Sequence, residues 1–172
     1  MVHATLCFIV RDGAPPHVLL GKKKRGFGMG KLNGIGGKLE PGELPDDGVI
    51  REVEEEVGIT IHKSGLHPAG RITFRFPFMK TFDHFVHVYC ATEWEGEPIE
   101  TEEMLPSWFS VNEIPFERMW QDDAYWLPIV LGGKHIVAEF TFGEDNETVT
   151  DWVIRKGDAC RLLDPETRTP RC

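Results

Sequence analysis

The stretch from Gly36 to Ile59 constrains the fold of this chain more than any other part of the sequence. It reads GGKLEPGELPDDGVIREVEEEVGI, and the turn formers Pro41 and Gly42 precede a segment over 44–57 in which apolar residues recur at helical spacing. The sequence therefore predicts a loop that leads into an amphipathic helix.

One face of this predicted helix gathers carboxylates. Glu52, Glu55 and Glu56 share the face because they are spaced i, i+3 and i+4, and Glu43 approaches from the preceding loop. A neighbouring face, which would pack on a core, carries Val49, Ile50, Val53 and Val57. Carboxylates held together repel one another, and a hard cation such as Mg²⁺ relieves the repulsion while also binding substrate phosphates. The alternative is a solvated acidic helix face, which is common on protein surfaces.

The spacing of the residues within this stretch favours a metal site over a solvated acidic helix face. Gly37 is followed after five residues by Glu43, and after seven more by the run REVEEEVGI that begins at Arg51. These residues fill every specified position of the Nudix box, so the chain resembles the Nudix hydrolases, which cleave nucleoside diphosphates linked to another moiety. The resemblance implies an α/β fold, the Nudix α/β/α sandwich with a mixed β-sheet.

Length and charge limit the class of protein. The 172 residues suit one domain over 1–155, followed by a polar C-terminal tail over 156–172. The net charge of −9 argues against a nucleic-acid polymer as partner, so an anionic substrate must be held locally by metal and a few basic residues. The cysteines form no CxxC pair, and no apolar run suits a signal peptide or a membrane span. We therefore expect a cytoplasmic protein without a membrane partner.

Alternating apolar residues and turn signals outline the remaining elements. Strands are predicted over 4–10, 17–23, 69–78, 82–92, 107–111, 136–142 and 148–154, and a second helix over 125–131. Loops are predicted over the Gly-rich basic segment 24–33 and the acidic segment 93–106.

Segments outside the box indicate the substrate. The runs GKKKRGFGMGKLNGIGGK at 21–38, EEMLPSWF at 102–109 and MWQDDAYWLP at 119–128 resemble the mammalian-type MutT branch of the family, the oxidised purine nucleoside triphosphatases. The resemblance runs from about residue 4 to residue 155. The segment near 75–83 departs from it and is expected to be a turn that does not touch the site. His84 and His87 receive no role.

The resemblance implies a base pocket whose residues have suitable chemistry. Trp120 can stack on a purine, Asn33 offers a donor and an acceptor to a base edge, and a buried Asp122–Asp123 pair would share one proton. A helix N-cap is the alternative role for the aspartates, and core packing is the alternative for the tryptophans. The implied pocket comprises Thr5, Phe27, Asn33, Phe74, Met104, Trp120, Asp122, Asp123 and Trp126, with Lys23 near it.

The resemblance also implies how the metal and the catalytic groups are supplied. Mg²⁺, for which Mn²⁺ could substitute, would be bound by the Gly36 carbonyl, Glu52, Glu55 and Glu56, and Glu103 is a further candidate as ligand or catalytic residue. Either Glu56 or Glu52 would be the general base. Arg51 would hold a glutamate of the box through a charge-assisted bond, and Glu43 would support the loop.

These implications predict Mg²⁺-dependent hydrolysis of oxidised purine nucleoside triphosphates, of the 8-oxo-dGTP and 2-oxo-dATP type, to the monophosphate and pyrophosphate. We expect a monomer that acts on a small-molecule nucleotide and serves nucleotide-pool sanitation. One alternative is a Nudix hydrolase of another nucleotide, such as a dinucleoside polyphosphate, a cap-like compound or a nucleotide sugar. A second alternative is a nucleotide-binding Nudix module without catalysis.

Overall fold

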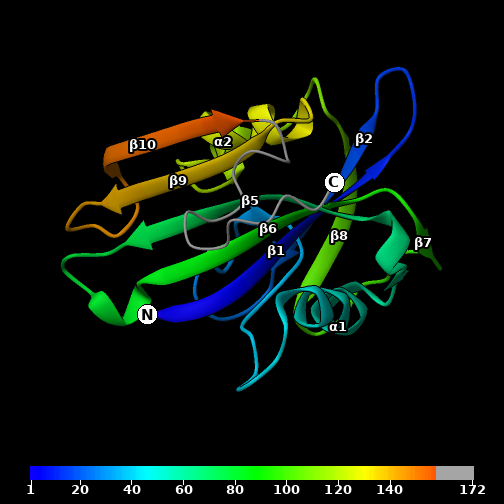
Figure 1. Cartoon of the computed structure of the whole chain (residues 1–172), viewed down its shortest axis with the longest axis horizontal. Coiled ribbons are helices and arrows are strands. Elements are labelled where there is room, and N and C mark those ends of the chain that lie inside the picture. Colours follow the sequence, from blue (N-terminus) through cyan, green and yellow to red (C-terminus); the bar gives the residue numbers. More distant parts are fainter. Residues whose placement is uncertain (158–172) are drawn as a thin grey trace, which may run out of the picture.

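A computed structural model gives the structure of residues 1–157. Figure 1 shows the arrangement of the elements. The strands are β1 (Val2–Arg11), β2 (His17–Lys23), β3 (Leu32–Asn33), β4 (Thr60–Ile61), β5 (Leu66–Arg75), β6 (His84–Ala91), β7 (Trp94–Glu95), β8 (Met104–Ser110), β9 (His135–Phe142) and β10 (Val149–Gly157). The α-helices are α1 (Pro45–Val57) and α2 (Asp123–Leu131), and short 3-10 turns lie at η1 (Lys63–Gly65), η2 (Lys80–Phe82) and η3 (Phe116–Arg118).

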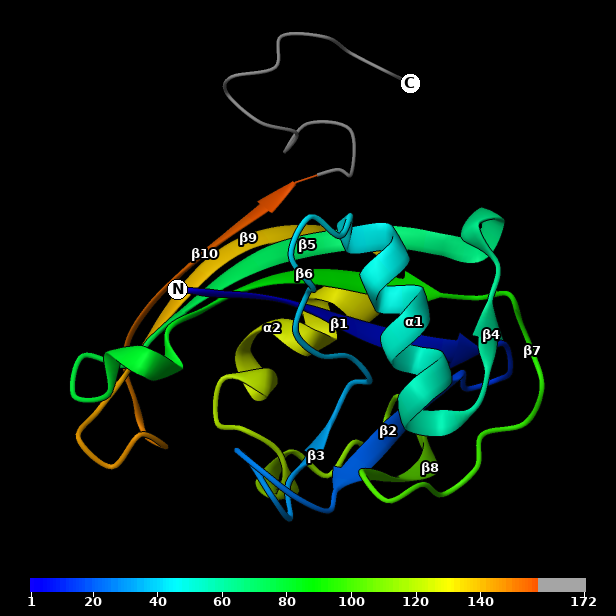
Figure 2. The ribbon, with the colours of Figure 1, turned by 90° about the horizontal axis from the view of Figure 1, so that it is seen from below.

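The larger sheet is mixed. Its strands follow the order β10-β9-β5-β6-β1-β2-β3. An eighth strand, β8, also pairs with β2 but is not part of this linear order. The pairs β1–β6 and β5–β9 are parallel, whereas the other pairs of this sheet are antiparallel. β4 and β7 form a separate two-stranded ribbon. In Figure 2 the strands β9, β5 and β6 arch over α2, which lies inside the curve of the sheet.

The central strand β1 contributes to two hydrophobic cores. Leu6 and Phe8 belong to the core that includes α2, whereas Cys7 and Ile9 belong to the core that includes α1. Successive strand residues point to opposite faces, so the helices cover opposite sides of the sheet. The predicted α/β/α sandwich with a mixed sheet is confirmed.

The boundaries of α1 follow from its end residues. Pro45 occupies the first turn, where a missing N–H costs nothing. Gly58 ends the helix in the left-handed region at φ 71°, and its N–H donates to the Glu54 carbonyl. The predicted helix over 44–57 is therefore confirmed to within one residue. α2 begins at Asp123, two residues before the predicted start at 125.

Short strands account for most differences from the predicted elements. β3 lies in the predicted loop over 24–33, and β7 and the start of β8 lie in the predicted loop over 93–106. β5 ends at Arg75, before the predicted end at 78. β10 continues to Gly157, past the predicted domain end at 155, and the rest of the predicted tail lies outside the described residues. In the part of the chain that the structure covers, no helix is both long and apolar enough to span a membrane.

Candidate active site

Two adjacent glycines, Gly36 and Gly37, allow the Glu56 and Glu52 carboxylates to approach the backbone of the loop. The Gly36 N–H donates to Glu56 Oε2 at 3.0 Å. A Cβ atom on Gly36 would lie 2.3 Å from the Thr5 carbonyl oxygen, and one on Gly37 would lie 2.3 Å from Glu52 Oε2. Any side chain at these positions would collide with β1 or displace a carboxylate. The glycines therefore let Glu52 and Glu56 lie directly against the backbone of the loop.

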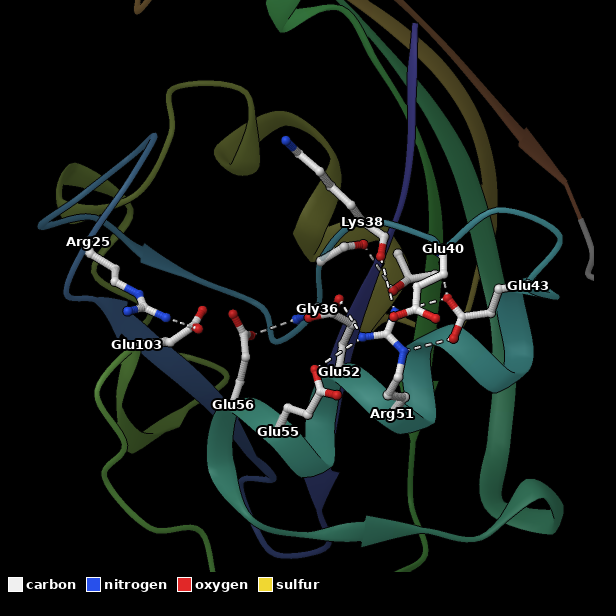
Figure 3. Close-up of polar contacts among 12 residues, drawn as sticks. Arg25, Gly36, Lys38, Glu40, Glu43, Arg51, Glu52, Glu55, Glu56 and Glu103 are labelled. Carbon is white, nitrogen blue, oxygen red and sulfur yellow. Dashed lines mark hydrogen bonds and ion pairs between the residues drawn. The ribbon is translucent and has the colours of Figure 1, made fainter.

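Arg51 organises the remaining glutamates of the box. Its Nε and Nη2 donate to the two carboxylate oxygens of Glu43 at 2.8 and 2.9 Å. Its Nη1 donates to Glu52 at 2.9 Å and to Glu55 at 3.1 Å. The predicted role of Arg51 as a holder of box glutamates agrees with these bonds, which Figure 3 shows. The two bonds from Arg51 are the main reason why the pKa of Glu43 falls to about 2.

The carboxylates do not converge as the helical spacing predicted. Among residues 1–157, no three His, Cys, Asp or Glu side chains are gathered closely enough to hold a metal ion. Glu55 is turned towards Arg51, and Glu103 forms an ion pair with Arg25. The arginines hold the outer carboxylates, and metal binding by Glu52, Glu55 and Glu56 stays a prediction.

The inner carboxylates have shifted pKa values. Glu56 is 5% exposed, and its burial raises the pKa of the carboxyl to about 7, with a smaller contribution from the charge of Glu52. The Gly36 N–H and the charge of Lys23 oppose this rise. Burial also raises the pKa of Glu52. Glu56 can therefore gain or lose a proton near neutral pH, which suits a group that accepts a proton from water.

The donor set fits a hard divalent cation. It consists of the Glu52 and Glu56 carboxylates beside the glycine backbone, with Glu55 and Glu103 at the edges, and all of these offer oxygen ligands. The close approach at Gly37 shows that the chain leaves room for the Glu52 carboxylate and for no side chain at that place. One or both outer carboxylates would have to leave their arginines to complete a coordination shell.

An aromatic cluster lies at the end of the loop that carries Phe27. The Phe27 ring stacks on Trp120 with centroids 4.9 Å apart, lies 4.3 Å from Phe82, and is parallel within 8° to the His84 ring at 6.4 Å. Lys31 Nζ lies 4.9 Å from the centroid of the Trp120 ring. Stacking of this kind suits a planar base. The aromatic clamp, as we name it, comprises Phe27, Phe76, Phe82, His84, Trp120 and Phe142.

Sequence reasoning missed part of this clamp. The segment near 75–83 was expected to stay away from the site, but it supplies Phe76 and Phe82, both of which contact Phe27. His84, which received no role, pairs with Phe74 across β5 and β6. Its Nδ1 lies in hydrogen-bonding contact with the Phe82 carbonyl, and its pKa is lowered, mainly by burial. Pairing the adjacent ends of the two predicted strands would have placed His84 opposite Phe76, two residues from its actual partner Phe74.

The adjacent aspartates are buried and bonded. Asp122 and Asp123 are each 2% exposed. Asp122 Oδ2 accepts a hydrogen bond from Trp126 Nε1 at 2.8 Å, and Asp123 Oδ2 accepts one from the Trp120 N–H at 3.1 Å. Burial raises the pKa of Asp122 to about 6, and burial together with the charge of Asp122 raises that of Asp123 well above its ordinary value. One proton is therefore shared near neutral pH.

The N-cap alternative is wrong for Asp122. This residue stands at the cap position of α2, yet its backbone is helical at φ −66° and ψ −29°, and its side chain makes no capping bond. Asp123 anchors the Trp120 backbone instead. The two carboxyls thus fix the tryptophans on either side of them.

Two predicted pocket residues lie in the cores. Trp126 is fully buried against Phe8 and acts on the site only through its bond to Asp122. Met104 is 2% exposed and packs with the core under α1, where a Cβ on Gly21 would meet its sulfur. Both side chains are packed among core residues, and their predicted contact with a base stays a prediction.

The remaining predicted residues lie between the carboxylates and the clamp or beside them. Thr5 is buried, and its Oγ1 lies 3.5 Å from the Gly37 carbonyl. Asn33 is half-buried, and its Oδ1 accepts from the Gly34 N–H at 2.9 Å. Phe74 is half-buried near Phe140 and Phe142, rather than against Phe27. The charge of Lys23 lowers the pKa values of both Glu56 and His84, so Lys23 lies within electrostatic reach of both groups.

Comparison with known proteins identifies the family. The model of the NUDIX domain matches residues 1–129, and the chain belongs to the Nudix family. It is a Nudix hydrolase, and enzymes of this class act on small-molecule nucleotides and generally use a divalent metal ion.

Individual relatives are similar over most of their length. The chain is 42% identical over 145 residues to the oxidized purine nucleoside triphosphate hydrolase of Mus musculus, covering 84% of this chain and 90% of that protein. It is 45% identical over 138 residues to the enzyme of the same name from Danio rerio, covering 80% and 85%. The crystal structure of a mutator MutT protein from Bacillus halodurans shares the fold, with a TM-score of 0.75, 23% identity, and coverage of 90% and 97%.

Proposed function

We propose that this Nudix hydrolase cleaves oxidised purine nucleoside triphosphates, of the 8-oxo-dGTP and 2-oxo-dATP type, to the monophosphate and pyrophosphate. The buried Asp122–Asp123 pair beside Trp120 carries the proposal. A pair that shares one proton offers one donor and one acceptor, and moving the proton exchanges them. The same atoms can then bind the different hydrogen-bonding edges of an oxidised guanine and an oxidised adenine. The activities named for the two vertebrate relatives support this substrate class.

The carboxylates beside the glycines suit the phosphate chemistry. We propose Mg²⁺ as the metal, with Mn²⁺ as a substitute, held by Glu52, Glu56 and the Gly36 carbonyl, with Glu55 or Glu103 completing the shell. When bound, the ion neutralises charge on phosphate oxygens and lowers the pKa of a bound water. Glu56 is the preferred proton acceptor, because the Gly36 N–H holds its Oε2 beside the proposed metal.

Lys23 and Arg51 have separate tasks in this proposal. Lys23 lies where its charge reaches both Glu56 and His84, so it can bind a phosphate between the metal and the base. Arg51 binds three glutamates and holds the box rigid, without contacting the substrate. We further propose a cytoplasmic monomer that sanitises the nucleotide pool and has no nucleic-acid polymer as partner, which fits the net charge of −9.

Pyrophosphate release from a panel of nucleotides tests the function. With Mg²⁺ present, 8-oxo-dGTP and 2-oxo-dATP should have kcat/KM values above those of dGTP and dATP, and CTP should be poor because a pyrimidine fills the clamp incompletely. ADP-ribose, a dinucleoside polyphosphate, a cap-like compound and a nucleotide sugar complete the panel. A tenfold preference for any of these four would favour the hydrolase of another nucleotide, and binding without turnover would favour the non-catalytic module.

A further inference from the structure

Two ion pairs tie the loop that carries Phe27 to a turn next to the carboxylates. We call residues 24–31 the clamp loop and residues 100–104 the acidic turn. Lys24 Nζ lies 2.7 Å from Glu100 Oε1 and donates to the Thr101 carbonyl at 2.8 Å. Arg25 pairs with Glu103, whose backbone carbonyl also accepts from the Lys24 N–H at 2.9 Å. The position of the clamp loop therefore depends on the acidic turn.

The acidic turn is itself hydrogen-bonded to α1, the helix that carries the box glutamates. Thr101 Oγ1 donates to the Glu56 carbonyl at 2.8 Å and accepts from the Met104 N–H at 3.2 Å. The charge of Glu103 also raises the pKa values of Glu52 and Glu56, so its carboxylate faces the same space as theirs. Figure 3 shows Glu103 across from Glu56, with Arg25 on its far side.

The far end of the clamp loop turns at three glycines and is held by backbone hydrogen bonds and by the ring contacts of Phe27. Gly26, Gly28 and Gly30 adopt φ values of 75°, 79° and 88°, which glycine reaches without strain, and nothing lies within 4 Å of a Cβ built on Gly26 or Gly30. Phe27 is 39% exposed although its ring stacks on Trp120. A purine that is to stack on this side of Trp120 must displace Phe27 or slide beside it.

We infer that Arg25 is a positioning residue that couples the aromatic clamp to the metal site. Arg25 and a bound divalent cation compete for the carboxylate of Glu103. When the cation recruits Glu103, the clamp loop loses one of the two ion pairs that tie it to the acidic turn, and Phe27 leaves Trp120 more often. This inference rests on the proposed metal-dependent function of the same site.

The expected coupling is small and reciprocal. The Arg25–Glu103 pair is exposed, with side chains 59% and 46% accessible, and exposed ion pairs contribute little free energy. A change of about two- to fivefold in the opening of the clamp loop is therefore expected on metal binding. A ligand that opens the loop should strengthen metal binding by the same factor, because coupling between two sites is mutual.

Hydrogen exchange with the metal ion alone tests the inference. Backbone amides of residues 24–31 are followed by mass spectrometry while Mg²⁺ is added to the whole protein without nucleotide, and residues 36–38 report metal binding at the site. In the wild type, Mg²⁺ should speed exchange of the clamp loop about two- to fivefold. In Arg25→Gln the loop should exchange fast already and should not respond. Arg25→Lys should restore part of the response, because it keeps the charge.

A matched variant separates this role from general anchoring. Glu100→Gln removes the neighbouring ion pair of the same loop and leaves Arg25 and Glu103 in place, so the loop should loosen and still respond to Mg²⁺. Arg25→Gln should also lower the Mg²⁺ concentration needed for half-maximal turnover about two- to fivefold. The inference is overturned if Mg²⁺ changes exchange at 36–38 and leaves 24–31 unchanged. If Mg²⁺ changes neither segment, the proposed metal site itself fails.

Discussion

At the scale of single residues, Glu56 is the group whose chemistry depends most on its surroundings. Glu56→Gln keeps the shape and can still accept from the Gly36 N–H, but it removes the charge that metal binding and proton transfer both need. We expect turnover to fall by at least about two orders of magnitude, with folding intact. Pyrophosphate release and circular dichroism of the variant check both parts. Turnover at the wild-type rate would remove Glu56 from the catalytic machinery.

Substrate choice should respond to the aspartates one at a time. Asp122→Asn and Asp123→Asn each abolish the shared proton, and each leaves a fixed donor and acceptor at a different position. The ratio of kcat/KM for 8-oxo-dGTP and 2-oxo-dATP should therefore shift about tenfold or more, and differently in the two variants. Both substrates should be measured across a pH series. Unchanged ratios in both variants would mean that these carboxyls do not contact the base.

The same pair should make stability depend on pH. The pKa of Asp122 is raised from 3.8 to about 6 in the folded protein, so folding is favoured below pH 3.8, and this contribution is lost as the pH rises through 6. A shift of this size corresponds to about 2–3 kcal/mol for a fully buried group. Asp122→Asn should flatten the change in unfolding free energy between pH 4 and pH 6.5. Urea unfolding at several pH values measures it, and an equally steep dependence in the variant contradicts the assignment.

At the scale of secondary-structure elements, α1 lacks a side-chain cap at its first turn. Leu44 has the extended backbone of an N-cap residue, at φ −76° and ψ 143°, but it makes no side-chain capping bond and is 65% exposed. Leu44→Ser should stabilise the protein by about 0.5–1 kcal/mol, because the serine hydroxyl can accept a hydrogen bond from a free N–H of the first turn. Thermal unfolding compares it with Leu44→Ala, which cannot cap. Equal melting temperatures for Ser and Ala would show that no capping bond forms.

Elements set by local pattern were predictable, and those set by distant pairing were not. α1 and β2 follow from Pro45, Gly58 and the apolar run over 18–20, which are local signals. The two-residue strands β3 and β7 exist only because β2 and β4 lie beside them, so no pattern within their own few residues indicates them. β8 was predicted too short for a related reason, since its first residues pair with the end of β2.

The site was predictable where a motif fixes the spacing. The glycines and glutamates of the box were found from one short stretch, and the role of Arg51 follows from its charge among them. The orientation of Glu103 was not predictable, because Arg25 comes from a loop distant in sequence. The contact of Phe82 with Phe27 was missed because a sequence does not show which aromatic side chains meet across distant segments.

At the scale of the whole molecule, removal of metal should stop the reaction without unfolding the protein. The carboxylates have partners of their own, since Arg51 binds Glu43, Glu52 and Glu55 and the Gly36 N–H binds Glu56. Chelation should therefore abolish turnover, and the melting temperature in chelator should stay within a few degrees of that of an untreated sample. Full recovery of activity on adding Mg²⁺ is the control. Cooperative unfolding in chelator alone would show that the metal is structural.

The alternation of β1 between two cores has a consequence for how this chain can change over time. Deleting one residue before Leu6 would turn the following side chains to the opposite faces, so that Phe8 would be driven under α1 and Ile9 would take its place beside Trp126. Both cores would be misfilled at once, and the strand could not compensate on one side alone. We therefore expect insertions and deletions in relatives of this protein to cluster in connections such as 11–16 and 76–83, and to spare the strand that joins its two halves.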